Sequence, residues 1–470
     1  MRIVLLAIYL LLVISVIFLE HKKPVEAVMW VVILICLPYA GAVLYLVFGN
    51  TVSIRLTGWL RRTRCGRRFR QKALRLIESP EPELPAGLSM NDEAVVRFNT
   101  TYNASPLTSY ETSEFLTSGA SHYVRLFEDI AAAKQSVYLE FYTIHHDEVG
   151  LRLVDALAQK AREGVCVWVM CDYIANLSTP SAMFRPLVEA GGMVKRLKPF
   201  LTHFRSHRKI VVIDQQTAYI GGMNIGRQYA NGARKKNPWR DTQLRLTGAC
   251  VSALTRYFLT DWVCALSARE LGRCRDTLLA TPPPAACPAG RPCQMIVGGV
   301  EDSSDSIKMC YLSMIRAARK RIRIQSPYFV PDSSILDALK TAAASGVAIE
   351  LMIPGIQASF FLDPVTRYYC AQLMEYGAAV YKYRGYIHAK TMIIDSEILC
   401  VGSVNMDIRS LEVSDEICGL FYDDAIVREY SEIFDLDIES CNRYSLRAFH
   451  ARPWFEKVKE RFFLLFAPLM

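Results

Sequence analysis

The chain has 470 residues, enough for two domains of ordinary size with further segments attached. Hydrophobic residues make up 51% of it and the mean hydropathy is +0.16, both high for a soluble enzyme. The formal net charge is +9, and residues 51–75 account for all of it. The neutral remainder argues against a broad nucleic-acid-binding surface. The 14 cysteines form no CxxC pair and no Cys/His cluster with zinc spacing, so we expect no metal site and a reducing compartment.

Two apolar runs lie near the N-terminus, at 3–19 and 27–48. Both lengths are in the range of membrane-spanning helices, the first only at its lower limit. A cleaved signal peptide is the alternative for the first run, but Glu-His-Lys-Lys follows it instead of a small-residue cleavage site. Pro38 would kink a helix in the second run, which membrane helices tolerate. We therefore expect two transmembrane helices within residues 1–50.

A basic juxtamembrane segment and a linker are expected at 51–92. Residues 51–75 contain nine basic and no acidic side chains, and a stretch rich in proline and acidic residues follows at 79–92. Because basic segments stay on the cytoplasmic side, both termini and the body of the chain should be cytoplasmic. The same charge could bind anionic lipid headgroups or form a solvated linker, and the sequence leaves both open.

Strands and helices then alternate in two similar series. The first series, at 93–280, should contain strands at 136–144, 165–172, 193–197, 208–214, 218–221 and 242–247, with helices at 121–134, 149–163 and 181–190. A Pro-rich linker occupies 281–292. The second series, at 293–470, should contain helices near 305–319, 333–345 and 365–376, with strands at 321–328, 348–353, 378–383 and 416–422. This pattern indicates an α/β fold of two repeated sandwich halves that form a pseudo-dimer.

Each series contains one copy of the same motif, 181 residues apart (207 to 388). The copies fit His-x-Lys-x-x-x-x-Asp: His207, Lys209 and Asp214, then His388, Lys390 and Asp395. Small residues and an asparagine follow each copy at the same spacing, with Gly221-Gly222-Met223-Asn224 after the first and Gly402-Ser403-Val404-Asn405 after the second. A duplication that only fills a core is disfavoured, because buried strands rarely carry a His-Lys pair on one face.

The spacing of the two motifs predicts that they act together on a phosphodiester. Side chains alternate along a strand, so the His and Lys of each copy point to the same side. If the halves pack as pseudo-twofold mates, two imidazoles and two ammonium groups meet in one pocket. The lysines would offset the charge of a phosphodiester without a metal or other cofactor. One imidazole would attack phosphorus to form a phosphohistidine, while the other would protonate the leaving alkoxide and then activate the incoming hydroxyl.

Further polar residues around the motifs are candidates for supporting roles. Asp241 and Glu416 follow the two motifs at comparable distances and could each orient an imidazole, although ordinary ion pairs fit equally well. Asn224 and Asn405 could donate to phosphate oxygens or cap helices. Asp214 and Asp395 begin tight turns, so a structural hydrogen-bonding role is favoured over proton transfer.

The motifs resemble the signature of the phospholipase D superfamily, a duplicated HxKxxxxD with GG/GS-x-N tails. Three further stretches are similar to those of bacterial cardiolipin synthases: WRDT at 239–242, SPYFVP at 326–331 and NMDIRS at 405–410. The resemblance implies a phosphatidyltransferase of the bacterial cytoplasmic (inner) membrane that converts two phosphatidylglycerol molecules into cardiolipin and glycerol. It also implies His207 as the nucleophile and His388 as the acid/base. A hydrolytic phospholipase D, or a transferase with another acceptor alcohol, is the alternative. A nuclease and a non-catalytic scaffold are both disfavoured.

The chain departs from the family pattern in three places, and these bear on acceptor preference and pocket shape. Ser206 stands where the family has Asn before the first His, 298–302 reads GGVED, and 413–416 reads VSDE. The C-terminal residues 454–466 mix aromatic and basic side chains, which is typical either of a segment at a membrane interface or of a helix packed on the enzyme. The expected partners are membrane phospholipids and the bilayer, with no nucleic acid. The oligomeric state stays open.

Overall fold

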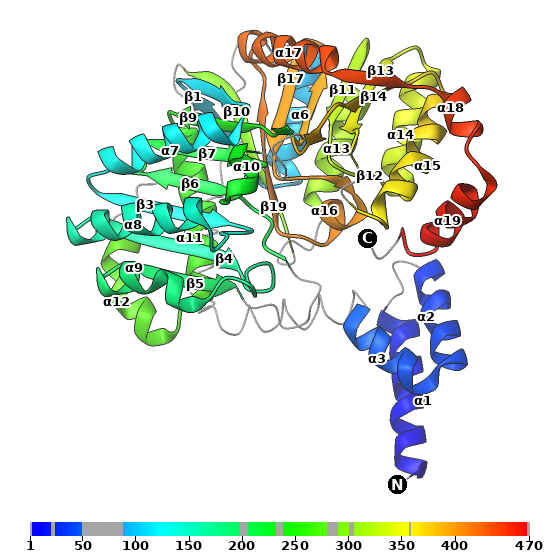
Figure 1. The fold of residues 1–470 in the computed structure, drawn as a ribbon, viewed down its shortest axis with the longest axis horizontal. Helices are drawn as coiled ribbons and strands as arrows, with labels where there is room; N and C mark the ends of the chain where they lie inside the picture. Colours follow the sequence, from blue (N-terminus) through cyan, green and yellow to red (C-terminus); the bar gives the residue numbers. More distant parts are fainter. Residues whose placement is uncertain are drawn as a thin grey trace.

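The computed structural model of the chain describes residues 2–19, 24–48, 88–197, 205–231, 238–279, 290–299, 305–356 and 359–467. The basic stretch at 51–75 and most of both expected linkers lie outside these residues. Figure 1 shows two α/β lobes side by side and a group of N-terminal helices that projects from them.

The first lobe is built on a seven-stranded sheet with the order β2-β9-β7-β6-β3-β4-β5. Its strands are β2 (Ser113–Leu116), β3 (Ser136–Phe141), β4 (Cys166–Asp172), β5 (Met193–Leu197), β6 (Ile210–Ile213), β7 (Thr217–Gly221) and β9 (Gln243–Thr247). Its helices are α7 (Gly119–Ala132), α8 (Glu148–Arg162), η1 (Ser181–Phe184), α9 (Arg185–Glu189), α10 (Arg227–Asn231), α11 (Cys250–Ala265) and α12 (Ala268–Leu279). Strands β3, β4 and β5 run parallel, and the other pairs are antiparallel.

The second lobe is built on a nine-stranded sheet with the order β1-β10-β19-β17-β16-β11-β13-β14-β20. Its strands are β1 (Leu107–Tyr110), β10 (Arg291–Gly298), β11 (Arg321–Gln325), β13 (Ala348–Pro354), β14 (Ala379–Tyr383), β16 (Thr391–Ile394), β17 (Ile398–Gly402), β19 (Glu416–Phe421) and β20 (Cys441–Tyr444). Its helices are α6 (Met90–Thr101), α13 (Ser306–Ala317), α14 (Ser333–Ala344), α15 (Leu362–Met374), α16 (Ile408–Glu412), α17 (Asp424–Glu439), α18 (Leu446–His450) and α19 (Trp454–Leu464).

Six neighbouring strands recur in the same order in both sheets. The series β9-β7-β6-β3-β4-β5 of the first lobe corresponds to β19-β17-β16-β11-β13-β14 of the second. Two short parallel pairs complete the strands: β12 (Phe329–Val330) with β18 (Met406–Asp407), and β8 (Trp239–Arg240) with β15 (Tyr386–Ile387). The β8–β15 pair joins the two lobes. The expected architecture of two repeated α/β halves is therefore confirmed.

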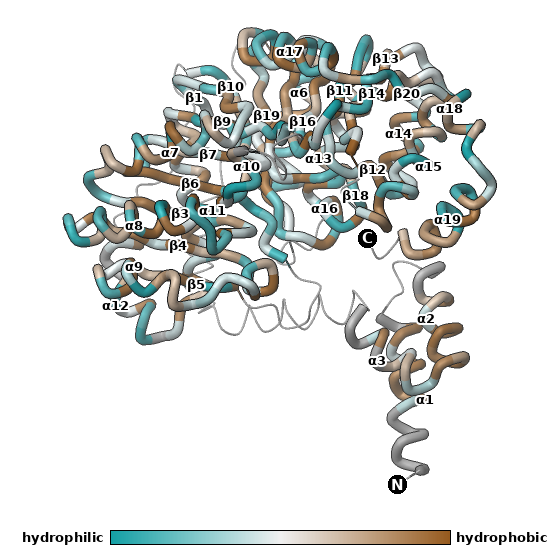
Figure 2. Tube along the Cα trace, viewed as in Figure 1, coloured by the Kyte–Doolittle hydropathy of each residue, from teal (hydrophilic) through white to brown (hydrophobic). Residues whose placement is uncertain are grey.

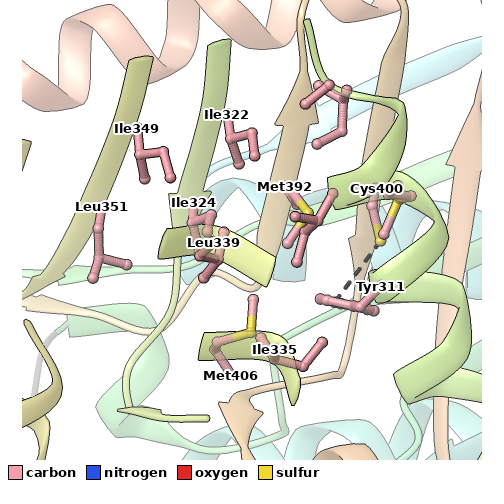
Figure 3. Packing of buried hydrophobic residues seen from close by; sticks show 14 of the residues in the cluster. Tyr311, Ile322, Ile324, Ile335, Leu339, Ile349, Leu351, Met392, Cys400 and Met406 are labelled. Carbon is pink, nitrogen blue, oxygen red and sulfur yellow. Dashed lines mark hydrogen bonds between the residues drawn. The ribbon is translucent and has the colours of Figure 1, made fainter. Parts of the chain in front are cut away.

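Apolar spacing explains how the helices cover these sheets. In α8, Asp147 caps the first turn through the N–H groups of Val149 and Gly150, and Leu153, Val154 and Leu157 then bury one face. The second lobe repeats this arrangement. Figure 3 shows the isoleucines and leucines of β11 and β13 packed against Ile335 and Leu339 of α14. Strands covered on both faces are buried along their whole length, as β3 and β19 are.

A third cluster of buried residues lies between the lobes and is shared by them. It includes Val212 of β6, Phe258 and Trp262 of α11, Ile417 of β19 and Tyr430 of α17. Stacked rings continue this cluster, since Trp168 and Trp262 lie 4.9 Å apart at an interplanar angle of 11°. The two halves therefore share one continuous apolar core, which fixes the position of one motif relative to the other.

One segment lies elsewhere than expected. We predicted that the first half begins at residue 93, yet β1 pairs with β10 in the sheet of the second lobe, and α6 packs on α13. The Gln294 side chain stabilises this arrangement because its amide donates to Ser105 O at 2.8 Å and to Thr100 Oγ1 at 3.1 Å. A strand-edge pairing across nearly 200 residues leaves no local signal in the sequence.

The N-terminal helices are α1 (Arg2–Leu19), α2 (Pro24–Cys36) and α3 (Pro38–Phe48). The apolar run at 27–48 is interrupted at Leu37, between α2 and α3, where Pro38 was expected to kink the helix because it lacks an N–H. The three helices pack around Val16, Trp30, Leu34 and Tyr45, and Figure 2 shows their apolar character. Within the described part of the chain, no helix has both the length and the hydropathy needed to cross a bilayer.

Two aspartates hold the motif hairpins in place. Asp395 lies between β16 and β17, and its carboxylate accepts hydrogen bonds from the backbone N–H groups of residues 319, 320 and 321 at 2.8, 2.7 and 2.7 Å. Asp214 does the same for residues 134, 135 and 136 at 2.8, 2.7 and 2.8 Å. Both aspartates have left-handed backbones, with φ of 51° and 52°. Each carboxylate therefore ties its hairpin to the start of a neighbouring strand, which favours the structural role.

Replacing Asp395 by Ala should lower stability while sparing the chemistry. The change leaves three backbone N–H groups without their acceptor and places Ala at a strained positive φ, so we expect a loss of about 2–4 kcal/mol. Asp395→Asn keeps an acceptor oxygen and a residue type that tolerates this backbone, so its loss should be smaller. Thermal unfolding in detergent measures both variants. An Asp395→Ala protein with unchanged unfolding and abolished turnover would instead assign this residue to catalysis.

Candidate active site

The motif histidines lie on one pocket of about 1170 Å³ between the lobes. His207 precedes β6 and His388 precedes β16, so the buried strands fix where each side chain begins. Each histidine is also held by the opposite lobe: His207 N donates to Asp415 O at 2.9 Å, and His388 N donates to Arg240 O at 2.6 Å. The expected convergence of the two copies on one pocket is therefore seen for the histidines.

Each imidazole is paired with a carboxylate from the opposite lobe. His207 Nδ1 lies 2.9 Å from Glu416 Oε1, and His388 Nδ1 lies 2.6 Å from Asp241 Oδ2. Both carboxylate side chains are fully buried, whereas the side chains of His207 and His388 are 14% and 12% exposed. Nδ1–H donation to a carboxylate fixes the tautomer and directs Nε2 away from it. Asp241 and Glu416 thus occupy the orienting positions that the sequence proposed.

Burial sets the ionisation of these pairs. It lowers the pKa of each histidine to about 4, against the opposing effect of the paired carboxylate. Burial opposes ionisation of Glu416 and Asp241 as well, but the facing imidazoles and lysines keep the pKa of both carboxyls below its ordinary value. At neutral pH both imidazoles are therefore neutral and both carboxylates are charged, which leaves an Nε2 lone pair available for attack.

The motif lysines lie beneath the pocket rather than on its wall. Lys209 and Lys390 are almost completely buried, with 0% and 1% exposure, and each ammonium donates to the carbonyl of its own motif histidine. Burial lowers the pKa of Lys209 to about 7 and that of Lys390 to about 8. Strand alternation correctly predicted the side to which the lysines point. It did not predict that they would be buried below the pocket.

The two asparagines line the pocket. Asn224 Oδ1 accepts from Thr143 N at 3.2 Å, and Asn224 Nδ2 donates to the Tyr229 hydroxyl at 3.1 Å. Asn405 Oδ1 has no hydrogen-bond partner among the described residues. Helix α16 is capped by Asp407, whose carboxylate accepts from Ser410 N, so Asn405 is not its cap. A role toward a bound ligand is thereby favoured for Asn405.

Small residues after each motif make room for the carboxylates. A Cβ on Gly222 would lie 2.2 Å from Asp241 Oδ1, so no larger residue fits there. At the equivalent place in the second half, Ser403 donates its hydroxyl to Glu416 Oε2. A Cβ on Gly402 would lie 2.2 Å from Ile417 O. The GG and GS tails therefore differ because Asp241 lies directly against Gly222, whereas Glu416 accepts a hydrogen bond from Ser403.

The sequence did not single out most of the pocket wall. Trp239, Tyr328 and Arg409 lie in the family-like stretches, whereas Tyr142, Tyr229, Tyr386 and Arg205 were not singled out. Tyr142 and Tyr328 follow the equivalent strands β3 and β11, so an internal alignment of the repeats could have found Tyr142. Ser206 is not on the wall, because its hydroxyl donates to buried Glu140. His145, which follows β3, does not line the pocket either.

Comparisons with known proteins identify the family of the chain. The family described as "Cardiolipin synthase, PLD-like domain" matches residues 126–262 and 311–438, and the N-terminal family described as "Phospholipase_D-nuclease N-terminal" matches 7–50. The chain is 33% identical over 470 residues to a cardiolipin synthase of Oceanobacillus iheyensis, covering 98% of this chain and 96% of that protein. It is 33% identical over 472 residues to the major cardiolipin synthase ClsA of Bacillus subtilis, covering 98% and 97%.

A solved structure supports the fold. The crystal structure of phosphatidylserine synthase from Haemophilus influenzae superimposes with a TM-score of 0.65 at 15% identity, over 80% of this chain and 100% of that one. At that identity the likeness concerns the architecture alone. The sequence relatives cover almost the whole chain, including the N-terminal helices and both motifs. The chain therefore belongs to the cardiolipin synthase family of phospholipase D-like proteins.

Proposed function

We propose that the protein is a cardiolipin synthase that transfers a phosphatidyl group from one phosphatidylglycerol to the hydroxyl of another, releasing glycerol. The observation that carries this proposal is the pair of crossed contacts, His207 with Glu416 and His388 with Asp241, on one pocket. Two oriented imidazoles on a shared pocket, one neutral and one protonated, provide the nucleophile and the proton donor that phosphodiester exchange requires.

In the first step one imidazole attacks phosphorus. We assign this role to His207 by family resemblance, because the geometry of the two histidines is reciprocal. Its Nε2 forms the P–N bond as the P–O bond to glycerol breaks, and His388 gives its proton to the departing oxygen. Burial favours neutral His388, but the negative charge of a bound phosphodiester stabilises the imidazolium. Glu416 stabilises the positive charge that develops on His207.

In the second step the proton moves from the acceptor hydroxyl to His388, and a P–O bond replaces the P–N bond. His388 accepts the proton of the incoming hydroxyl, whose oxygen attacks phosphorus and breaks the P–N bond. The negative charge of the bound phosphodiester favours the protonated form of Lys209 and Lys390, which then supply positive charge from below the pocket, and the asparagine amides lie on its wall. Atoms and protons balance over the two steps, since the proton that leaves with glycerol is replaced by the one taken from the acceptor.

The pocket opening supports a lipid substrate. Phe361, Phe462 and Phe463 line it from the second lobe, and Trp30 and Leu44 line it from the N-terminal helices. Apolar side chains at this position can contact acyl chains and exclude water. Water exclusion matters because water and an alcohol compete for the same phosphohistidine, so transfer requires an opening of this kind.

We further propose that this reaction takes place at the bacterial cytoplasmic membrane, with the catalytic halves on the cytoplasmic side. The apolar N-terminal helices would hold the protein there, and the basic residues at 51–75 would face anionic headgroups. Helix α19 supports this placement. It packs on the second lobe through Phe463, yet leaves an apolar face exposed: Trp454, Phe455, Val458 and Phe462.

The product decides between transfer and hydrolysis. The purified protein, reconstituted in vesicles of phosphatidylglycerol, should form cardiolipin and glycerol, with phosphatidic acid as a minor product. Mass spectrometry of the lipids measures all three. Added glycerol should drive cardiolipin back to phosphatidylglycerol through the same intermediate. His207→Ala and His388→Ala should each lose activity by several orders of magnitude.

Controls separate the alternatives. Mainly phosphatidic acid would favour a hydrolase, and no reaction until another alcohol is added would favour a different acceptor. The reaction should persist in EDTA, because the lysines supply the positive charge. Quenching in SDS at mildly alkaline pH after a brief reaction with phosphate-labelled lipid should leave a label on the wild type that is stable to base and lost in acid, and full turnover by a variant without both histidines would refute the mechanism.

Replacing Glu416 by Gln should slow the reaction by roughly 10²- to 10⁴-fold, because the imidazole loses the charged acceptor that fixes its tautomer and stabilises its imidazolium. Ionised Glu416 raises the pKa of His207 against burial, so the neutral variant should lower that pKa further. The acidic limb of kcat/KM, where His207 becomes protonated, should therefore move to lower pH. Glu416→Asp should recover part of the rate, and Glu432→Gln, on the exposed side of α17, should be unaffected. An unchanged rate in Glu416→Gln would remove this role.

Removing the exposed apolar face of α19 should separate membrane contact from chemistry. The double variant Phe455→Ser, Val458→Ser should lose several-fold activity toward phosphatidylglycerol in vesicles, because less apolar surface can enter the interface. Its activity in detergent micelles should stay near that of the wild type. The matched control is Leu436→Ser, which removes an apolar side chain with 64% exposure from α17. Equal losses in vesicles and micelles would show that the face serves the fold instead.

A further inference from the structure

The repeat makes it possible to compare the two walls of the pocket position by position. The backbone N–H of each motif histidine donates to a carbonyl of the opposite lobe. Because the two motif copies are 181 residues apart, adding 181 to a residue number near His207 gives the equivalent position near His388. By this offset, Arg205 is equivalent to Tyr386, and Arg409 is equivalent to Gln228. The histidines and lysines of the motifs, which form the floor of the site, are therefore present in both halves. The two arginines have no basic equivalent on the other wall.

The wall beside His388 is aromatic. The rings of Trp239, Tyr386 and Tyr229 lie 5.3, 6.0 and 6.3 Å from the imidazole ring of His388. Trp239 and Tyr386 are also in contact with each other, at 4.6 Å between ring centroids. A wall of this kind excludes water and offers little to a second anion.

The wall beside His207 is basic. The ring of Tyr142 lies 4.9 Å from that of His207, and Arg205 and Arg409 line the same part of the pocket. Asp172 accepts from Arg205 Nη1 at 3.1 Å and is itself buried. Burial lowers the pKa of Arg409, and the nearby charge of Arg205 lowers it further. Asp172 and Asp407 offset part of the repulsion between the two guanidinium groups, and a bound anion would offset it further.

We propose that Arg205 and Arg409 bind the phosphodiester of the acceptor phosphatidylglycerol, the phosphate that does not react. This inference rests on the proposed function. The product contains two phosphodiesters joined by one glycerol, and the histidine–lysine floor takes only one of them. Guanidinium groups match the planar geometry of phosphate oxygens and make charge-assisted hydrogen bonds to them. The pocket volume of about 1170 Å³ exceeds what a single headgroup needs.

The subsite would explain how a lipid acceptor wins over a small alcohol. Water and glycerol carry no phosphate, so neither can use the basic wall. Binding of the second phosphate would hold the acceptor hydroxyl beside the phosphohistidine and raise its effective concentration. Arg205 and Arg409 are therefore proposed as specificity residues for the acceptor, with no part in forming the intermediate.

The test compares two reactions of the same enzyme. Cardiolipin formation from phosphatidylglycerol uses a phosphate-bearing acceptor, whereas exchange of labelled glycerol into phosphatidylglycerol uses one without phosphate. Arg409→Gln should reduce cardiolipin formation by about 10- to 100-fold, the usual effect of losing a charged hydrogen-bond donor. Glycerol exchange should stay within about threefold of the wild type. Arg409→Lys keeps the charge and should fall between the two.

Further variants guard against trivial effects. Removing Arg205 alone would leave buried Asp172 without its cation, so the variant of choice is the double change Arg205→Gln, Asp172→Asn. Arg443→Gln removes an exposed arginine from β20 and should change neither reaction. Glycerophosphoglycerol, which has the acceptor phosphate but no acyl chains, should be preferred to glycerol by the wild type and not by the Arg409→Gln protein.

The outcomes separate this inference from the proposed function. A wild-type protein that makes no cardiolipin removes both. If the wild type makes cardiolipin but Arg409→Gln and the double variant lose both reactions equally, the arginines serve the donor or the fold and the inference falls. It also falls if neither reaction changes. Selective loss of cardiolipin formation, together with loss of the preference for glycerophosphoglycerol, supports it.

Discussion

The site depends on one exchange between the halves: each supplies the carboxylate that orients the other's histidine. Glu416 pairs with His207 and Asp241 pairs with His388. Moving an ion out of water costs several kcal/mol, so buried carboxylates and lysines persist only where opposite charges and hydrogen bonds meet them. Neither half meets this need by itself. Docking of the halves and assembly of the catalytic groups are therefore a single event, and the shared apolar core between the lobes supplies much of its driving force.

Much of the fold was predictable because its signals are local and occur twice. The strand at 193–197 has the predicted bounds, and the motif hairpins follow from apolar runs that end at Asp214 and Asp395. Helices α11 and α17 were not predicted, although both cover the central core. The pairing of β1 with β10 was missed for a different reason, since edge strands join through backbone groups that carry no sequence signature.

Prediction of the site reached the identity of the residues but not their arrangement. The duplicated motif identified both histidines, and spacing suggested Asp241 and Glu416 as partners. Which carboxylate meets which histidine depends on contacts across 147 and 209 residues, which only the packing of the lobes determines. The lysines show a similar limit. Strand alternation gives the side to which Lys209 points, but its depth follows from how far the hairpin is buried.

The separation along the chain between His207 and Glu416 has a consequence during protein synthesis. Glu416 follows His207 by 209 residues, so the first half emerges from the ribosome and can begin to fold long before β19 exists. During that interval His207 has no carboxylate to fix its tautomer, and Asp241 has no imidazole to orient. A chain that ends before His388 therefore lacks both crossed contacts. Translation of the last quarter of the protein, which contains both His388 and Glu416, is therefore what completes the site.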